Sequence, residues 1–163
     1  MSASDTIAKL NRKLQVKIRV ATREAAKEII ALVIELIKIR TRFESTGKDG
    51  ALKELKESTI KFRERYSKRL HPDTAPPTSN VTATGQMLDA LTGKASGSKV
   101  TIFIKNTKRR RELSGSRSTL TNEQVRKYVE NEREFLVLRD DEKNQIIEVA
   151  TEIIRQNIRN LLK

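Results

Sequence analysis

The feature that most constrains the fold is a helical repeat of apolar and small residues that runs, without glycine or proline, from about residue 5 to residue 42. Its members follow one another in steps of three and four, which places them on one face of an α-helix. At about 1.5 Å per residue, such a helix is more than about 50 Å long. A helix longer than a small domain indicates that part of it packs against neighbouring copies. The repeat consists of Ile7, Leu10, Leu14, Ile18, Ala21, Ala25, Ile29, Leu32, Leu36 and Ile39.

A competing pattern lies near the start of this repeat. Between Leu14 and Val20, apolar and polar residues alternate strictly, as they do in a strand that is buried on one side. The alanine-rich continuation and the unbroken period of about 3.6 residues favour the helix. We therefore expect one long helix, with a strand as the alternative for this short stretch.

Apolar side chains are scarce in this chain of 163 residues, a length that suits a single domain. Hydrophobic residues make up 36% and aromatic residues 4%, so we expect the core to be built from single faces of amphipathic helices. The net charge of +13 fits either a polyanionic partner or a basic but otherwise ordinary surface. Because lysines and arginines are spread along the whole chain, the pattern argues against one dedicated nucleic-acid face.

Cysteine is absent from the chain, which excludes disulfides and thiolate metal sites and is typical of a protein that folds in a reducing cytoplasm. The most apolar run, Ile29–Ile39, contains Glu35 and Lys38. It is also shorter than the roughly 20 apolar residues that a membrane span needs. We therefore expect no membrane association.

The middle of the chain combines short elements with loops. A glycine-containing break at 45–50 precedes a second helix, expected at about 51–69, and all three prolines fall in a loop at 71–80. Alternating threonine, valine and isoleucine then predict an antiparallel hairpin at about 85–106, with its turn at Gly97–Ser98. Two isolated strands are marginally stable in water. This hairpin, expected to be the only sheet, must therefore lie on the long helix or join strands of another copy.

Two further helices are predicted in the C-terminal part. Thr121 and Gln124 form a capping box at the start of a short helix, 121–131. The acidic residues 140–142 suit the positive end of a last helix, 140–162. The fold class is therefore α+β, with a long N-terminal helix and a C-terminal helix packed on a small antiparallel hairpin. The buried face of the last helix is expected to contain Ile146, Ile147, Ala150, Ile153, Ile154, Ile158 and Leu161.

A run of cations lies between the hairpin and the short helix. The Ser-Gly-Ser at its centre is typical of a flexible connector, so we expect a basic loop at 107–120. Three interpretations remain open: a solvated loop, salt bridges between subunits, or contacts with phosphates. No aromatic residue is interleaved with the cations, which argues against stacking on single-stranded bases. The candidate contact residues are Lys108, Arg109, Arg110, Arg111 and Arg117.

Residues suited to catalysis or cofactor binding are scarce. His71, the only histidine, stands beside a proline in the predicted loop and cannot form a histidine metal site alone. The acidic triplet 140–142 is explained by its place at a helix start, and the sequence has no phosphate-binding or dinucleotide-binding glycine motif. We therefore expect neither an enzyme nor a protein that binds a cofactor or a small-molecule substrate.

Four short segments follow one another between residues 35 and 163: IKIRTRFESTG, LKESTIKFRERY, NVTATGQMLDALTG and REFLVLRDDEKNQI. Their order and spacing resemble those of tailed-bacteriophage neck and tail-completion proteins, of the virion-morphogenesis and HK97-type neck families. The resemblance implies a small α+β virion subunit that forms a homo-oligomeric ring near the portal, where head joins tail. It also implies contacts with the portal and tail proteins of the virion, and no catalytic residues.

The resemblance assigns structural roles to two of these segments. One leads into the hairpin and contributes Leu88 to the core; its matched residues are Thr84, Gly85, Met87 and Leu88. The other packs just ahead of the last helix; its matched residues are Arg133, Phe135 and Leu136. The chain departs from the family at Glu134, where relatives often have proline. The basic segment and LTNEQVRKYVENE also replace the Tyr-Ala and Glu-x-Gly-Thr pattern of many relatives.

The sequence thus predicts a structural virion protein of the neck, made in the host cytoplasm, with a role in tail completion or as a head–tail connector. A basic surface suits non-specific contact with packaged DNA or attraction to acidic portal and tail proteins. The alternative is a non-specific nucleic-acid-binding protein, favoured by the net charge of +13 and the run Lys108–Arg111. A scaffold or chaperone that acts only during assembly is a third hypothesis.

Overall fold

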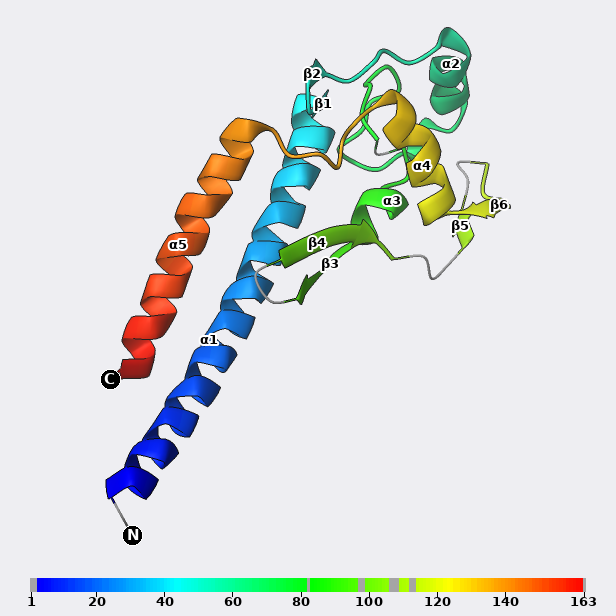
Figure 1. Cartoon of the computed structure of the whole chain (residues 1–163). Coiled ribbons are helices and arrows are strands. Elements are labelled where there is room, and N and C mark those ends of the chain that lie inside the picture. The colour runs from blue at the N-terminus through cyan, green and yellow to red at the C-terminus, as the bar shows by residue number, and fades with distance from the viewer. Residues whose placement is uncertain (1–2, 82, 97–98, 106–108, 112–113, 163) are drawn as a thin grey trace.

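The computed structural model describes residues 3–81, 83–96, 99–105, 109–111 and 114–162, and describes the backbone alone at 3–11, 109–111, 117–119, 132 and 162. It has the predicted α+β fold, in which helix α1 (Ala3–Ile39) is continued by a π-helical turn, η1 (Arg40–Glu44). Helix α5 (Asp140–Leu162) lies antiparallel along α1, and the smaller elements gather around the C-terminal half of α1 (Figure 1). The stretch Leu14–Val20 is therefore helical.

Between the two long helices, the described residues form short helices and three separate two-stranded antiparallel sheets. These elements are β1 (Thr46–Gly47), β2 (Gly50–Ala51), α2 (Glu57–Arg65), the 3₁₀ turn η2 (Ser67–Arg69), α3 (Gln86–Asp89), β3 (Leu91–Ser96), β4 (Lys99–Ile104), β5 (Arg109–Arg111), β6 (Arg117–Thr121) and α4 (Asn122–Glu132). The capping box at the start of α4 is confirmed, because Thr121 and Gln124 each accept a bond from the other's backbone N–H. The proline-containing segment 71–80 has neither helix nor strand, as predicted.

The hairpin β3–β4 lies against α1. Gly93 allows this close approach, because a Cβ atom there would lie only 2.6 Å from Cγ2 of Ile30 on α1. At the open end of the hairpin, Leu91 pairs with Ile104, and both side chains are buried. The long helix thus supplies the support that two isolated strands lack. The turn predicted at Gly97–Ser98 lies outside the described residues.

The core lies where the C-terminal half of α1 meets α3, the β3–β4 hairpin, the segment 133–138 and the start of α5. Leu88 and Phe135 are at its centre, each with 0% of its surface exposed. The α1 residues of this core cluster, Val33 and Ile37, both lie in the C-terminal half of the helix. The whole buried cluster consists of Val33, Ile37, Met87, Leu88, Leu91, Ile104, Phe135 and Ile146.

The segment predicted as a basic loop, 107–120, contains the hairpin β5–β6 instead. Gly115 has a φ of +91°, which favours glycine, and so permits the turn that separates the two strands. The Arg69 guanidinium donates a hydrogen bond to the carbonyl oxygen of Ser114 and lies against Gly115. The predictions of a loop over the whole of 107–120 and of a single sheet in the chain are wrong. The contact with Ser114 comes from a side chain 45 residues away, which the local sequence pattern does not contain.

Two other boundaries differ from those expected. Residues 46–51 form the tight hairpin β1–β2, held by a hydrogen bond of 3.0 Å from the Lys48 N–H to the Glu134 carbonyl oxygen. Helix α2 therefore begins at Glu57 and ends at Arg65, shorter than the expected 51–69. Residues 86–89, placed in the hairpin by the strand pattern, form helix α3 after Gly85, whose φ is +73°.

The buried face of α5 is narrower than predicted. Ile146 is buried, but Ile147, Ile154 and Ile158 are 61%, 41% and 43% exposed, respectively. These three residues are spaced seven and four apart, so they share one side of the helix, beside the face that contacts α1. A single neighbouring helix covers only part of an apolar stripe this wide, which is why three of its seven residues remain exposed.

Candidate functional site

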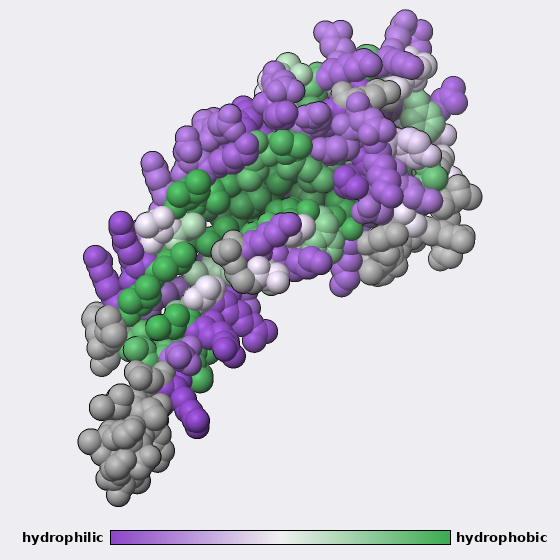
Figure 2. Space-filling view, viewed as in Figure 1, coloured by the Kyte–Doolittle hydropathy of each residue, from purple (hydrophilic) through white to green (hydrophobic). Residues whose placement is uncertain are grey.

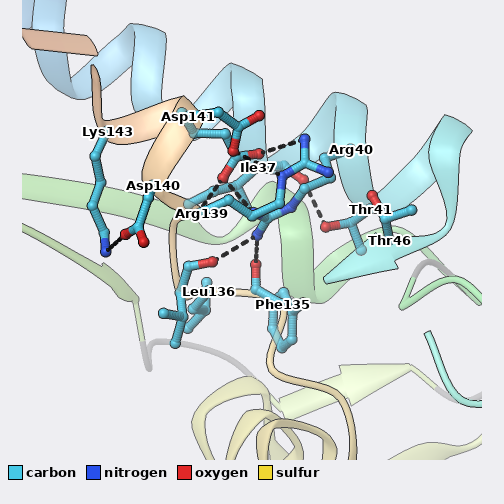
Figure 3. A network of polar contacts seen from close by, with 12 residues as sticks. Ile37, Arg40, Thr41, Thr46, Phe135, Leu136, Arg139, Asp140, Asp141 and Lys143 are labelled. Carbon is cyan, nitrogen blue, oxygen red and sulfur yellow. Dashed lines mark hydrogen bonds and ion pairs between the residues drawn. The ribbon is translucent and has the colours of Figure 1, made fainter. Parts of the chain in front are cut away.

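A buried ion pair joins the C-terminal end of α1 to the start of α5. The Arg40 guanidinium lies 2.5 Å from a carboxylate oxygen of Glu142, and the two residues are only 1% and 3% exposed. The other terminal nitrogen of Arg40 donates to the carbonyl oxygens of Phe135, at 2.5 Å, and Val137, at 3.2 Å (Figure 3). One side chain therefore ties together η1, the segment 133–138 and α5.

Burial disfavours the charged form of Arg40, and neighbouring groups offset part of this effect. Burial lowers the pKa of Arg40 below its ordinary value, while the nearby Glu142 carboxylate acts in the opposite direction. Glu142 also accepts a hydrogen bond of 2.8 Å from the Arg139 N–H and lies 3.3 Å from the Arg139 guanidinium. This network fixes the positions of η1, the segment 133–138 and α5 relative to one another. Its role is therefore structural.

Two further charged side chains, one buried and one partly buried, lie near the same end of the molecule. Arg63 on α2 donates to the carbonyl oxygens of Thr78, at 2.8 Å, and Asn80, at 3.3 Å, and holds the proline-containing segment against α2. Burial lowers the pKa of Arg63. Burial also raises the pKa of Glu130 on α4, although its carboxylate accepts a hydrogen bond from the Leu136 N–H. Both side chains therefore hold neighbouring segments in place, although the second carboxylate oxygen of Glu130 is buried without a hydrogen-bond partner.

Groups suited to metal binding or catalysis do not gather in the part of the chain that the structure describes. Among those residues, no group of three or more histidine, cysteine or acidic side chains is arranged so that it could hold a metal ion. His71 lies beside Asp73 at 3.3 Å, and its ring packs against Gly85. Within the same residues, no helix is both long enough and apolar enough to cross a membrane.

The candidate basic contact residues are only partly described. Lys108 lies outside the described residues, and Arg109, Arg110, Arg111 and Arg117 are described by their backbone. The pairing of β5 with β6 places Arg111 opposite Arg117 and Arg109 opposite Thr121.

Of the residues matched through the resemblance, Met87, Leu88 and Phe135 belong to one buried core cluster. Gly85 has a left-handed conformation at the start of α3, Thr84 precedes it, and Met87 and Leu88 are buried. Phe135 packs on this pair from the other segment, with Leu136 partly buried beside it. Arg133 donates hydrogen bonds to the carbonyl oxygens of Lys53 and Glu54. The structure therefore gives these residues packing and positioning roles.

Little of the described chain covers α1 between residues 12 and 20. Every residue from 12 to 20, here called the α1 spur, is exposed, and Leu14, Val16, Ile18 and Val20 are 43%, 61%, 46% and 55% exposed. Because two residues turn a helix by about 200°, the pair Leu14 and Ile18 faces away from the pair Val16 and Val20. Helix α5 ends opposite Lys17, whose ammonium donates to the Leu161 carbonyl oxygen at 3.4 Å. Helix α1 continues beyond this end of α5. The spur therefore presents apolar side chains on two opposite sides.

Hydrophobic surface also extends along the pair of long helices, as Figure 2 shows in the region between α5 and α1. At the other end of the pair lies a cleft of about 310 Å³, here called the acidic cleft. Its apolar lining comes from α1, and carboxylates from α1, η1 and α5 stand around it. These residues are Leu32, Leu36 and Ile39, with Glu35, Glu44 and Asp141.

Comparison with protein families, with curated proteins and with solved structures finds no match for this chain.

Sequence reasoning did not foresee the Arg40–Glu142 pair, whose members are 102 residues apart. One signal pointed to Arg40, because it continues the apolar face of α1 four residues after Leu36. The spur itself lies within the predicted helix.

Proposed function

We propose that this protein is a non-catalytic structural subunit that assembles with copies of itself into a ring at the neck of a tailed-bacteriophage virion. The observation that carries the proposal is the α1 spur, whose apolar side chains have no cover within the described chain. Burying one such side chain contributes roughly 1.5–3 kcal/mol. Several of them left exposed on a single projecting helix indicate an interface.

The two-sided character of the spur supports a ring. A helix with apolar residues on opposite sides needs a neighbour on each side, and every subunit of a cyclic ring has two neighbours. An isolated helical segment of this length, rich in β-branched residues, is also marginally stable in water. Packing between neighbouring subunits would provide the missing stabilisation.

The assignment to a phage neck rests on the four ordered segments that resemble neck and tail-completion proteins. Two of them supply the buried residues Leu88 and Phe135, which suits a purely structural subunit. The net charge of +13 suits contact with acidic portal and tail proteins, or with DNA that crosses a channel. A place in the virion neck follows from this proposal.

Mass photometry of the purified protein tests self-assembly, and cryo-electron microscopy of the particles tests the location. We expect a discrete oligomer and symmetric density for this chain at the head–tail junction. The variant Val16→Ser/Val20→Ser should fold with an unchanged helix content and fail to assemble. A protein that is absent from purified particles and monomeric at all concentrations would overturn the proposal, and absence from mature particles alone would favour the assembly-scaffold hypothesis.

Non-specific nucleic-acid binding is the second candidate, favoured by the arginines of α1. Arg12, Arg19 and Arg23 are spaced seven and four apart and so share one side of the helix, where all three are exposed. Phosphate contacts of this kind release counterions, so affinity for duplex DNA should fall steeply with salt. Undetectable binding at low ionic strength would remove this candidate.

A further inference from the structure

We propose that the α1 spur of one copy docks in the acidic cleft of a second copy of this chain. The proposal rests on the assembly function above and names the partner of the spur. It follows from three properties of the two surfaces: their complementary charge, their matching apolar residues and the rigid distance between them.

The acidic cleft carries excess negative charge in a basic protein. Four carboxylates line it, from Glu35, Glu44, Asp141 and Glu142, against the two guanidinium groups of Arg40 and Arg139. Arg40 is already paired with Glu142, and Arg139 lies between Glu142, at 3.3 Å, and Asp141, at 3.6 Å. Glu35 is exposed and forms no ion pair within the described part of the chain. The cleft can therefore accept a cation.

The spur has the opposite charge. Between residues 12 and 20 the sequence has four cations, Arg12, Lys13, Lys17 and Arg19, and no acidic residue. Lys13, Val16 and Val20 lie on one side of the helix, because they are spaced three and four apart. A cation beside two exposed valines matches a cleft in which carboxylates surround Leu32, Leu36 and Ile39.

A spur cannot reach the cleft of its own chain. Val16 and Ile39 belong to the same continuous helix, about 35 Å apart at about 1.5 Å per residue. A straight helix cannot fold back on itself, so only the spur of another copy can enter the cleft. Nucleic acid is a poor occupant, because the carboxylates would repel its phosphates.

The proposed contact joins two different surfaces of neighbouring copies. Each copy has one spur and one acidic cleft, which are different surfaces at opposite ends of α1. Such a contact passes from copy to copy and closes a ring when the rotation between copies permits it. The side of the spur that carries Leu14 and Ile18 remains available for a second neighbour.

Disulfide trapping tests the contact directly, because the natural chain has no cysteine. Full-length Val16→Cys protein is mixed with full-length Ile39→Cys protein, oxidised mildly and examined on a non-reducing gel. We expect a disulfide-linked dimer in the mixture, at least about tenfold more abundant than in either variant alone. Phe62→Cys is the matched control partner, since Phe62 on α2 is 43% exposed and Ile39 is 44% exposed. Equal cross-linking of Val16→Cys to both partners would overturn the proposal.

Charge reversal provides an independent readout. Lys13→Glu should reduce the cross-link between Val16→Cys and Ile39→Cys by about tenfold, and Glu35→Lys on the partner should restore it. Mass photometry of the same samples separates the two proposals. Oligomers that form without this cross-link contradict the spur–cleft contact alone, whereas a protein that stays monomeric contradicts both the contact and the assembly function.

Discussion

Two pairs of residues on α1 have the same spacing and similar chemistry but opposite surroundings. Val33 and Ile37 are four residues apart and are 5% and 1% exposed, whereas Val16 and Val20, also four apart, are 61% and 55% exposed. The first pair lies beneath α3, the β3–β4 hairpin and the segment 133–138. The second pair lies near the N-terminal end of α1, within the stretch where α5 ends opposite Lys17. The helix alone does not distinguish the pairs; their neighbours do.

This difference separates folding from assembly. Burial of an aliphatic side chain contributes roughly 1.5–3 kcal/mol, and Val33 and Ile37 obtain it when the chain folds. Val16 and Val20 can obtain it only when another molecule covers them. Substitutions near the core should therefore lower the stability of the monomer, and substitutions on the spur should affect association and leave the monomer intact.

The largest effect is expected from Phe135→Ala, at the centre of the core. The phenylalanine is 0% exposed, so its removal should leave a cavity and lower the free energy of unfolding by about 4 kcal/mol. Phe43→Ala is the matched control, because Phe43 is 66% exposed, and it should change stability by less than about 0.5 kcal/mol. Urea denaturation of both variants checks the comparison, and similar losses would contradict the assigned core.

A smaller loss is expected from Arg40→Met. The substitution leaves the buried Glu142 carboxylate without its guanidinium partner and should lower the free energy of unfolding by about 3 kcal/mol. Lys27→Met, which removes an exposed ion pair with Glu24, should leave the unfolding midpoint unchanged. If both variants unfold at the wild-type urea concentration, the buried network does not hold α1 to α5.

Ile154→Asp sharpens the comparison on α5. The sequence alone places Ile154 on the buried face, which would make a carboxylate there cost several kcal/mol. Because Ile154 is 41% exposed, we expect the loss to stay below about 1 kcal/mol. Ile146→Asp, at a residue that is 9% exposed, should be far more destabilising. Equal losses of stability for the two variants in thermal denaturation would support the wider buried face that the sequence predicts.

The smallest effect concerns pH. Burial raises the pKa of Glu130, so the folded state binds its proton more tightly than the unfolded chain does. The resulting stability is present below the ordinary pKa of a glutamate and is lost as the pH rises through the raised value. The side chain at this position stays neutral in the Glu130→Gln variant. The thermal midpoint of the variant should therefore rise relative to that of the wild type as the pH increases from 4 to 7. A constant difference across that range would show that Glu130 does not titrate as described.

Much of the helical framework was predictable, because helix signals are local. The capping box at Thr121 and the acidic start of α5 both lie within one turn of the ends they mark. The hairpin β5–β6 was not predictable, because its arginine-rich strand lacks the alternation of a strand and its turn contacts Arg69 from a distant part of the chain. The Arg40–Glu142 pair likewise required two helices to meet.

The sequence by itself determined that α1 is one uninterrupted helix and that apolar residues occur along its whole length, because the period of about 3.6 residues and the absence of glycine and proline are local properties. Only the tertiary structure decided which of these residues are buried. The smaller elements pack along the C-terminal half of α1 and leave residues 12–20 exposed. Burial depends on contacts between distant segments, and a pattern read along one helix does not contain them.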